Sequence, residues 1–323
     1  MPANYPSDVE AVQDLVNKYK RLRTEIGKVI IGQDEVVRDV LISIFSRSHC
    51  LLVGVPGLAK TLLVNTIAQS LGLTYNRIQF TPDLMPSDII GTEILDENRQ
   101  FRFIKGPLFA NIILADEINR TPPKTQSALL EAMQEYAVTA AGKRYELDLP
   151  FFVLATQNPI EQEGTYPLPE AQLDRFMFNV FLTYPEFDQE VLVVKNTTSD
   201  YKPKLEKVIN AQEILFFQDL IRRIPIPDNV LQYAVSLATK TRPNTTSATK
   251  DVNAYLSWGA GPRASQYLVV GAKCHAVLNG KYSPDIEDVK AVAMPILRHR
   301  LVRNYRAEAD GVSIEKIVND LLG

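Results

Sequence analysis

One stretch decides the fold of this chain: Gly54-Val55-Pro56-Gly57-Leu58-Ala59-Lys60-Thr61. A short apolar run precedes it, and a helix is expected over residues 61–71. A bound phosphate needs converging main-chain N–H groups, a cation and a helix N-terminus, and a loop between a strand and a helix supplies all three. We therefore expect this loop and Leu62 to bind a nucleotide, with Lys60 at the β- and γ-phosphates and the Thr61 hydroxyl on Mg²⁺.

Ala59 departs from the strict phosphate-loop pattern, in which a glycine precedes the lysine. Alanine adds only a methyl group and tolerates a helical φ, so we expect the loop to keep its conformation. For this segment alone, the alternative is an ordinary strand–turn–helix junction that happens to contain glycines and a lysine.

Two carboxylates, Asp116 and Glu117, end the apolar segment 111–115. Ligands of parallel sheets bind beyond the carboxyl ends of the strands, so both side chains are expected near the phosphate loop. Asp116 would join the Mg²⁺ shell, and Glu117 would orient and polarise an attacking water. The alternative is a pair of charges that merely ends a strand. Together with the loop, however, the pair favours a nucleoside triphosphatase over a kinase, because Glu117 provides a base for water.

Asn158 follows another apolar segment, residues 151–156. Its side chain is a candidate hydrogen-bond donor to the γ-phosphate or to the water. Asn-Pro dipeptides also form turns, and without other support a simple turn at Asn158-Pro159 is the favoured interpretation.

Short apolar runs recur after residue 50, at residues 50–54, 76–80, 111–115, 151–156 and 176–182. Helical or hairpin segments separate them, and this alternation predicts an α/β core with a parallel sheet and right-handed crossovers. Helices are expected before the core over residues 8–30 and 33–47. Two β-hairpins are expected within it, over residues 92–103, with a turn at Asp96-Glu97-Asn98, and over residues 137–149.

The C-terminal part of the chain lacks the short apolar runs that predict core strands. A polar run at residues 196–204 reads as a linker, and beyond it helix starts dominate at residues 227–228, 261–262 and 283–284. The sequence therefore predicts an α/β core over residues 1–195, followed by a small all-helical lid domain over residues 205–323.

The composition excludes several classes of protein. The 323 residues are 46% hydrophobic and 23% charged, which is typical of a globular protein and not of a disordered chain. The apolar runs are far shorter than the roughly 18 residues that a membrane span needs, and the N-terminus lacks the pattern of a secretion signal. Only two cysteines are present, so we expect a reducing, cytoplasmic location. The net charge of -3 provides no global attraction for nucleic acid.

Three motifs in this order resemble the AAA+ ATPases, and most closely the MoxR family. They are the phosphate loop, residues 114–126 (LADEINRTPPKTQ) and residues 164–176 (GTYPLPEAQLDRF). The family lies in a branch that includes magnesium-chelatase motor subunits and the replicative helicase of archaea and eukaryotes, and alanine is frequent in it at the position of Ala59. The resemblance covers residues 25–301. It implies a parallel-sheet P-loop core with inserted β-hairpins, and ATP bound between this core and the helical lid.

The resemblance also assigns roles in nucleotide binding. Ile31 and Gly32, within the segment 29–33, would pack against adenine, although an interhelical turn is the alternative for this segment. Asn158 would be the first sensor of the γ-phosphate.

Two arginines receive roles as well. Arg175 resembles the arginine finger that reaches into a neighbouring subunit's site; the alternative is a surface arginine paired with Asp174 or Glu170. Arg263 resembles the second sensor on the lid. Because Pro262 suits a first helical turn, Arg263 would lie at the positive end of a helix, and triphosphate binding would compensate this unfavourable placement. A solvated arginine is the alternative.

The resemblance implies a Mg²⁺-dependent ATPase that works as a ring, expected to be a hexamer, and remodels or matures a partner protein, often one with a von Willebrand factor A domain. Two other functions stay open: a nucleic-acid motor or loader, and a nucleotide switch that does not hydrolyse. A basic run near the C-terminus is interpreted as a solvated face or as a source of intersubunit salt bridges, in preference to a nucleic-acid contact: Arg298, Arg300, Arg303 and Arg306.

Overall fold

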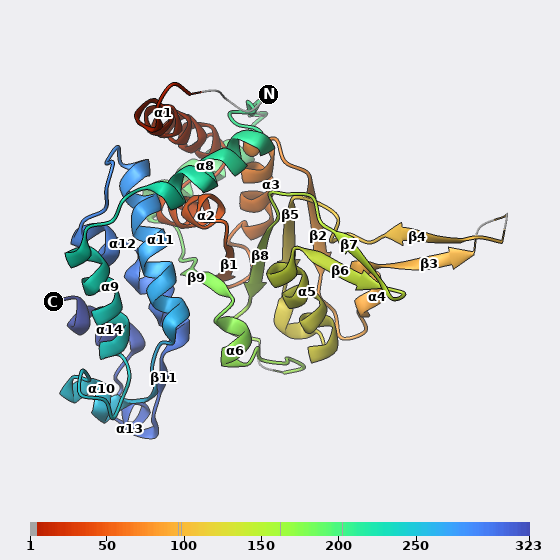
Figure 1. Cartoon of the computed structure of the whole chain (residues 1–323). Coiled ribbons are helices and arrows are strands. Elements are labelled where there is room, and N and C mark those ends of the chain that lie inside the picture. Colours follow the sequence, from red (N-terminus) through yellow and green to blue (C-terminus); the bar gives the residue numbers. More distant parts are fainter. Residues whose placement is uncertain (1–4, 96, 98, 162, 202) are drawn as a thin grey trace.

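The computed structural model describes residues 5–95, 97, 99–161, 163–201 and 203–323. Residues 96 and 98 of the expected hairpin turn lie outside the described residues, as does residue 202 of the expected linker. The described chain forms a layered α/β half, on the right of Figure 1, and a helical half on the left.

A five-stranded parallel sheet forms the centre of the α/β half. Its strands, in spatial order, are β2 (Tyr75–Gln79), β5 (Ile112–Asp116), β8 (Phe152–Gln157), β1 (His49–Val53) and β9 (Phe176–Phe181). They coincide with the five expected apolar runs, with small shifts at the ends. Both β1 and β5 pair with β8 in parallel. The carboxyl ends of these three strands carry the phosphate loop, the acidic pair and Asn158, so the topology brings all three to one edge of the sheet.

Helices cover both faces of this sheet. One face packs with α1 (Asp8–Gly27), α2 (Asp34–Phe45) and α3 (Lys60–Leu71), and the other with α4 (Pro86–Ile90) and α5 (Pro123–Glu135). Successive strand residues point to opposite faces: Leu114 belongs to the first cluster and Ile113 to the second. The first helix ends earlier than expected, at Gly27, but its start is capped by Ser7 as the sequence indicates.

Two antiparallel hairpins interrupt the α/β alternation, as predicted. The first consists of β3 (Gly91–Leu95) and β4 (Phe101–Lys105), and it extends away from the body of the protein in Figure 1. The second consists of β6 (Ala137–Ala140) and β7 (Lys143–Glu146). The rings of Phe103 and Tyr145 stack with their centroids 4.1 Å apart and so join the two hairpins.

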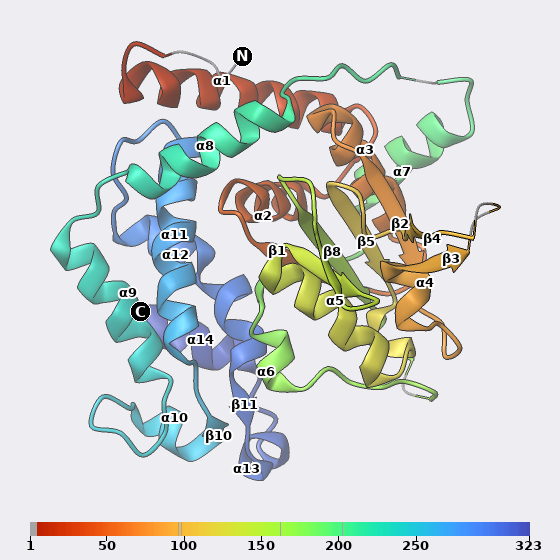
Figure 2. The same ribbon diagram turned by 45° about the vertical axis from the view of Figure 1, so that its right-hand side comes forward.

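The short segments around the site complete the α/β half. They are the 3₁₀ helix η1 (Ile118–Arg120), α6 (Glu170–Leu173) and α7 (Phe187–Thr197). The last of these helices extends to Thr197, so the expected linker begins later than residue 196. Figure 2 shows α6 and α7 far apart, with the sheet between them.

The C-terminal half is mainly helical, as expected. It contains α8 (Ala211–Arg223), α9 (Asp228–Lys240), α10 (Lys250–Tyr255), α11 (Pro262–Leu278), α12 (Ile286–Leu297), η2 (Arg298–Arg300), α13 (Tyr305–Ala309) and α14 (Ile314–Leu322). The prediction of an all-helical lid was wrong in one detail, because β10 (Leu256–Trp258) and β11 (Val302–Arg303) pair as an antiparallel ribbon. This pairing joins segments far apart in sequence, and each is too short to give a strand pattern.

Another expected boundary is also displaced. The helix expected to start at residues 283–284 begins at Ile286, because the side chain of Asp285 accepts a hydrogen bond from the main-chain N–H of Asp288 and caps the helix there. Within the described ranges, no helix combines the length and the apolar character required to cross a bilayer.

Candidate nucleotide-binding and catalytic site

The phosphate loop connects β1 to α3. Gly57 has a φ of 88°, a conformation that glycine adopts at little cost. Ala59 caps α3 with a φ of 55° and a ψ of 27°, which is the left-handed region. The helical φ given as the reason that alanine is tolerated here is therefore not the one adopted, and α3 begins at the next residue, Lys60. A left-handed residue with a Cβ costs roughly 1–2 kcal/mol.

The Lys60 ammonium lies inside the loop that it follows. It donates hydrogen bonds to the carbonyl oxygens of Gly54 and, at 3.2 Å, of Val55. Burial lowers the pKa of Lys60, while the charges of Asp116, Glu117 and Glu161 oppose that change. The ammonium is therefore partly desolvated and close to the acidic pair, and a phosphate would offer it a stronger, charged acceptor than these carbonyls.

Asp116 ends β5 and is buried. Its Oδ1 accepts a hydrogen bond from Thr156 Oγ1 at 2.6 Å, and its Oδ2 accepts from Arg77 Nη2 at 2.7 Å. Mg²⁺ in nucleotide sites usually keeps several waters and takes one or two protein oxygens together with phosphate oxygens. The Asp116 carboxylate and the Thr61 hydroxyl, at the start of α3, provide that type of donor set.

Glu117 comes immediately after β5 and has a left-handed backbone, with a φ of 56°. Its Oε2 accepts hydrogen bonds from Gln79 Nε2 at 2.8 Å and from Arg120 Nη1 at 3.1 Å. Its main-chain N–H donates to Thr156 Oγ1 at 2.9 Å. A strained backbone of this kind persists where surrounding contacts fix it, which is common at functional sites.

Asn158 follows β8 and is buried. Its Oδ1 accepts a hydrogen bond from the main-chain N–H of Ile160 at 3.2 Å, so the residue does form the local turn that the Asn-Pro dipeptide indicates. The parallel pairing of β8 with β1 and β5 also places this turn between the phosphate loop and the acidic pair.

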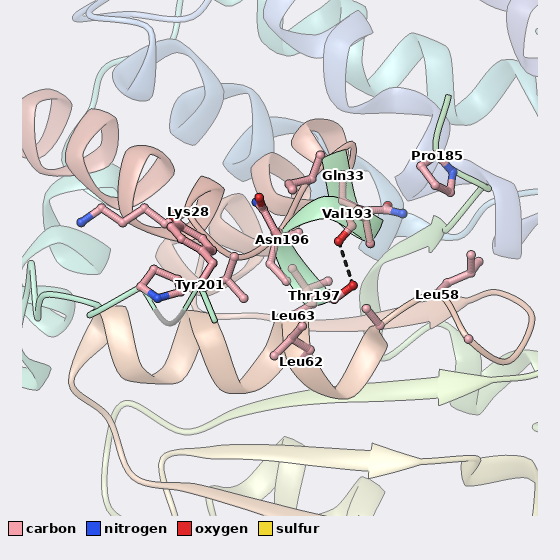
Figure 3. Close-up of a pocket in the computed structure, with 16 residues that line it drawn as sticks. Lys28, Gln33, Leu58, Leu62, Leu63, Pro185, Val193, Asn196, Thr197 and Tyr201 are labelled. Atoms are coloured by element: carbon pink, nitrogen blue, oxygen red, sulfur yellow. Dashed lines mark hydrogen bonds between the residues drawn. The ribbon is translucent and has the colours of Figure 1, made fainter. Parts of the chain in front are cut away.

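A largely apolar pocket of about 250 Å³ lies beside the loop (Figure 3). Its lining comes from residues 28–31 and 33, from the phosphate loop and the start of α3, from Pro185, and from α7 with the segment after it; among these residues are Ile31, Gly57, Leu58, Ala59, Leu62, Val193, Asn196 and Tyr201. The prediction for Ile31 agrees with this placement. Gly32 does not line the pocket, and a Cβ on it would meet the side chain of Gln189.

The described lining residues of this pocket end at Pro203, before the lid of residues 205–323. ATP binding between the core and the lid stays a prediction. In Figure 3, Asn196 and Thr197 of α7 lie across the pocket from Leu62 and Leu63 of α3. Helix α7 therefore lines this pocket opposite α3, a contact that the sequence pattern alone does not reveal.

Arg175 and Arg263 lie together, away from this pocket. Arg175 Nη1 donates to the carbonyl oxygen of Leu130 at 2.6 Å, and Arg263 Nη1 donates to Asp174 Oδ2 at 3.1 Å. Asp174 thus pairs with Arg263 and with Arg300, not with the adjacent Arg175. Neither Arg175 nor Arg263 is among the described residues that line the pocket beside the phosphate loop.

Comparison with known proteins identifies the family. The profile of the ATPase family associated with various cellular activities (AAA) matches residues 49–178, and that of the AAA lid domain matches residues 248–321. The chain is 41% identical to Chaperone MoxR1 of Mycobacterium tuberculosis over 98% of its own length and 84% of that protein. The chain belongs to the MoxR family of AAA+ ATPases. The resemblance inferred from the motifs is confirmed.

Other relatives match this MoxR-family ATPase over nearly all of its length. The uncharacterized protein YeaC of Bacillus subtilis is 40% identical over 92% of the chain and 91% of its own length. A crystal structure described as a candidate ATPase of Cytophaga hutchinsonii has a TM-score of 0.91 and 44% identity, with 97% of this chain and 96% of that chain covered. The predicted fold, a P-loop AAA+ core with a helical lid, is confirmed, and so is the prediction of an ATPase.

Four residues of this MoxR-family site escaped the sequence analysis: Arg77, Gln79, Arg120 and Thr156. Gln79 is paired with Asp116 in the β2–β5 register, so it lies beside the acidic pair only once β2 is known to neighbour β5. Thr156 is wholly buried and lies in the apolar run of β8. The sequence does show polar residues near the ends of these strands. That they lie beside the acidic pair can be inferred only when the strand order is known.

Proposed function

We propose that this MoxR-family ATPase binds ATP with its base in the pocket beside α7 and its phosphates on residues 54–62. Lys60 neutralises the β- and γ-phosphates, and Asn158 hydrogen-bonds the γ-phosphate. Thr61 and Asp116 hold Mg²⁺, which when bound neutralises charge on the phosphate oxygens. Glu117 accepts a hydrogen bond from the attacking water and orients it. The observation that carries this proposal is the meeting of the loop, Asp116 and Glu117 at one edge of the sheet.

The proposed ATPase site is completed by a second subunit. Arg175 serves as the arginine finger of a ring, which we propose to be a hexamer, and Arg263 lies beside it as the sensor of the lid. Neither residue is among the described residues that line the pocket of their own chain, and this supports a role for Arg175 in another subunit's site. An arginine finger accelerates phosphoryl transfer about 10³–10⁵-fold.

The cycle of ATP binding and hydrolysis serves a chaperone-like role in the cytoplasm, in which the ring remodels or matures a partner protein. The partner class that we propose carries a von Willebrand factor A domain. Similarity to a protein named Chaperone MoxR1 supports the role. In this proposal residues 1–195 form the nucleotide-binding core and residues 205–323 the lid that moves with the cycle.

Three variants test the ATPase proposal. Lys60→Ala is expected to abolish nucleotide binding, and Glu117→Gln is expected to retain ATP without turnover. A mixture of inactive Lys60→Ala and Arg175→Ala subunits is expected to recover part of the activity, because one subunit supplies the pocket and the other the finger. No recovery under assembling conditions counts against a shared site. Steady phosphate release by the wild type dismisses a switch that does not hydrolyse, and salt-dependent stimulation by DNA would favour the motor function instead.

A further inference from the structure

Arg300 is an unusually buried arginine that binds the segment around Arg175. Its side chain is only 2% exposed. The basic run that contains Arg300 was interpreted as a solvated face or a source of intersubunit salt bridges, and a solvated face is wrong for this residue. The cause is tertiary: η2 follows α12 directly, and its last residue, Arg300, contacts the segment 174–177 of the core, as the hydrogen bonds show.

The Arg300 guanidinium fixes the main chain on both sides of the finger. Nη2 donates to the carbonyl oxygens of Asp174 at 2.9 Å and of Phe176 at 2.7 Å, and Nη1 donates to that of Met177 at 3.2 Å. The carbonyl oxygen of Arg175 itself accepts a hydrogen bond from the hydroxyl of Tyr267, in α11, at 3.2 Å. The backbone at residues 174–177 is thus held by side chains of the lid.

The carboxylate of Asp174 joins two arginines of the lid. Its Oδ1 accepts from Arg300 Nε at 2.8 Å and its Oδ2 from Arg263 Nη1 at 3.1 Å. One negative charge of the core therefore faces two guanidinium groups of the lid, and Asp174 pairs with these and not with the adjacent Arg175.

We propose that Arg300 is a positioning residue for Arg175: through Asp174 and the flanking carbonyl oxygens it couples the finger to the lid, so that the two move as one body. This inference rests on the proposed function, in which Arg175 completes the neighbour's site. A displacement of about 1 Å at a reacting centre can lower a rate by roughly 10²-fold. Loss of Arg300 should thus impair hydrolysis in the neighbouring subunit without altering the nucleotide pocket of its own.

The test uses Arg300→Lys in the full-length protein, because lysine keeps the charge but cannot reach several carbonyl oxygens at once. We expect kcat to fall on the order of 10²-fold, with the affinity for a fluorescent ATP analogue preserved. Mixing Arg300→Lys with Lys60→Ala subunits should recover activity, since the Lys60→Ala subunit carries an intact finger. Asp174→Asn, which keeps the side-chain shape, should give the same pattern and provides the test if Arg300→Lys does not fold.

A matched control comes from the same 3₁₀ helix. Arg298 also joins the lid to the core, through the carbonyl oxygen of Asn179 and the ring of Phe181, and it pairs with Glu315 within the lid. It makes no contact with residues 174–177 among its described hydrogen bonds and ion pairs. Arg298→Lys should lower the free energy of unfolding but keep kcat near the wild-type value, so that there is no lost activity for a mixture with Lys60→Ala subunits to recover.

The coupling is overturned if Arg300→Lys keeps the wild-type kcat, or if its lost activity is not recovered in the mixture. A reference mixture of Arg175→Ala and Lys60→Ala separates this result from failure of the shared site itself. Recovery in the reference mixture but not with Arg300→Lys rejects the coupling alone, whereas no recovery in either rejects the shared site on which it depends.

Discussion

Arg77 holds the carboxylate that is the proposed magnesium ligand. From β2, its Nε and Nη2 atoms donate to Asp116 Oδ2 at 3.0 and 2.7 Å. The guanidinium is 47% exposed, so it can swing away into solvent. Its Nη2 also donates to Gln79 Oε1 at 2.6 Å, and Gln79 in turn holds Glu117. The two carboxylates of the site are therefore linked through β2 before any ligand binds.

Replacing Arg77 should strengthen Mg²⁺ binding. An exposed ion pair contributes about 0.2–1 kcal/mol, so Arg77→Gln is expected to lower the Mg²⁺ concentration for half-maximal nucleotide binding by up to about fivefold. The measurement is a Mg²⁺ titration of the binding of a fluorescent ATP analogue. Arg120→Gln is the control, because Arg120 pairs with Glu117 and Glu161 instead. If Arg77→Gln needs the same or a higher Mg²⁺ concentration than the wild type for half-maximal nucleotide binding, Arg77 does not compete with Mg²⁺ for Asp116.

Ala59→Gly should stabilise the protein. The left-handed backbone of Ala59 costs roughly 1–2 kcal/mol, and the greater freedom of glycine in the unfolded chain offsets part of the gain. The expected net increase in the free energy of unfolding is up to about 1 kcal/mol, measured by urea denaturation. Ala128→Gly within α5 is the control, and it should destabilise the protein by about 0.5–1 kcal/mol because that position is right-handed helix. A loss of stability in Ala59→Gly would argue against strain in the loop.

Thr156→Val should damage both stability and catalysis. The buried hydroxyl donates to Asp116 and accepts from the N–H of Glu117, and valine has the same shape without these bonds. Leaving buried polar groups unpaired costs about 1–3 kcal/mol, which urea denaturation would detect. Steady-state kinetics should show a lower kcat, because both carboxylates lose a fixed neighbour. Thr156→Ser keeps the hydroxyl and should behave like the wild type; equal damage in both variants would point to packing and not to the hydrogen bonds.

Asp39 should make stability depend on pH between about 4 and 6. Burial raises the pKa of Asp39 to about 6, and Glu35 adds to the rise, while Arg38 and Arg298 oppose it. The folded protein binds this proton more tightly than the unfolded chain does. The contribution of protonated Asp39 to the free energy of unfolding is therefore fully present below pH 3.8 and is lost as the pH rises through about 6. Asp39→Asn should remove this part of the pH dependence, which is on the order of 3 kcal/mol. Unfolding curves of both proteins across this range give the difference, and parallel curves would contradict the assignment.

The sequence was sufficient for the architecture and for the centre of the site. Each core strand is a short apolar run because both faces of a parallel sheet are buried, and that pattern is readable without a structure. The phosphate loop and the pair Asp116-Glu117 were equally visible, since the residue types that bind phosphate and metal lie next to one another in the chain. The left-handed φ of Ala59 was not visible in the sequence, because a residue type does not specify one backbone conformation.

What the tertiary structure alone decided is which distant residues meet. Gln79 reaches Glu117 because β2 neighbours β5, and α7 lines the pocket beside the phosphate loop. Arg300, which looked like part of a solvated run, is buried against the segment that carries Arg175. These relationships join positions separated by tens to more than a hundred residues. The sequence determines the local chemistry of this protein, whereas strand order and helix packing determine which charges face each other, because burial and pairing depend on neighbours in space.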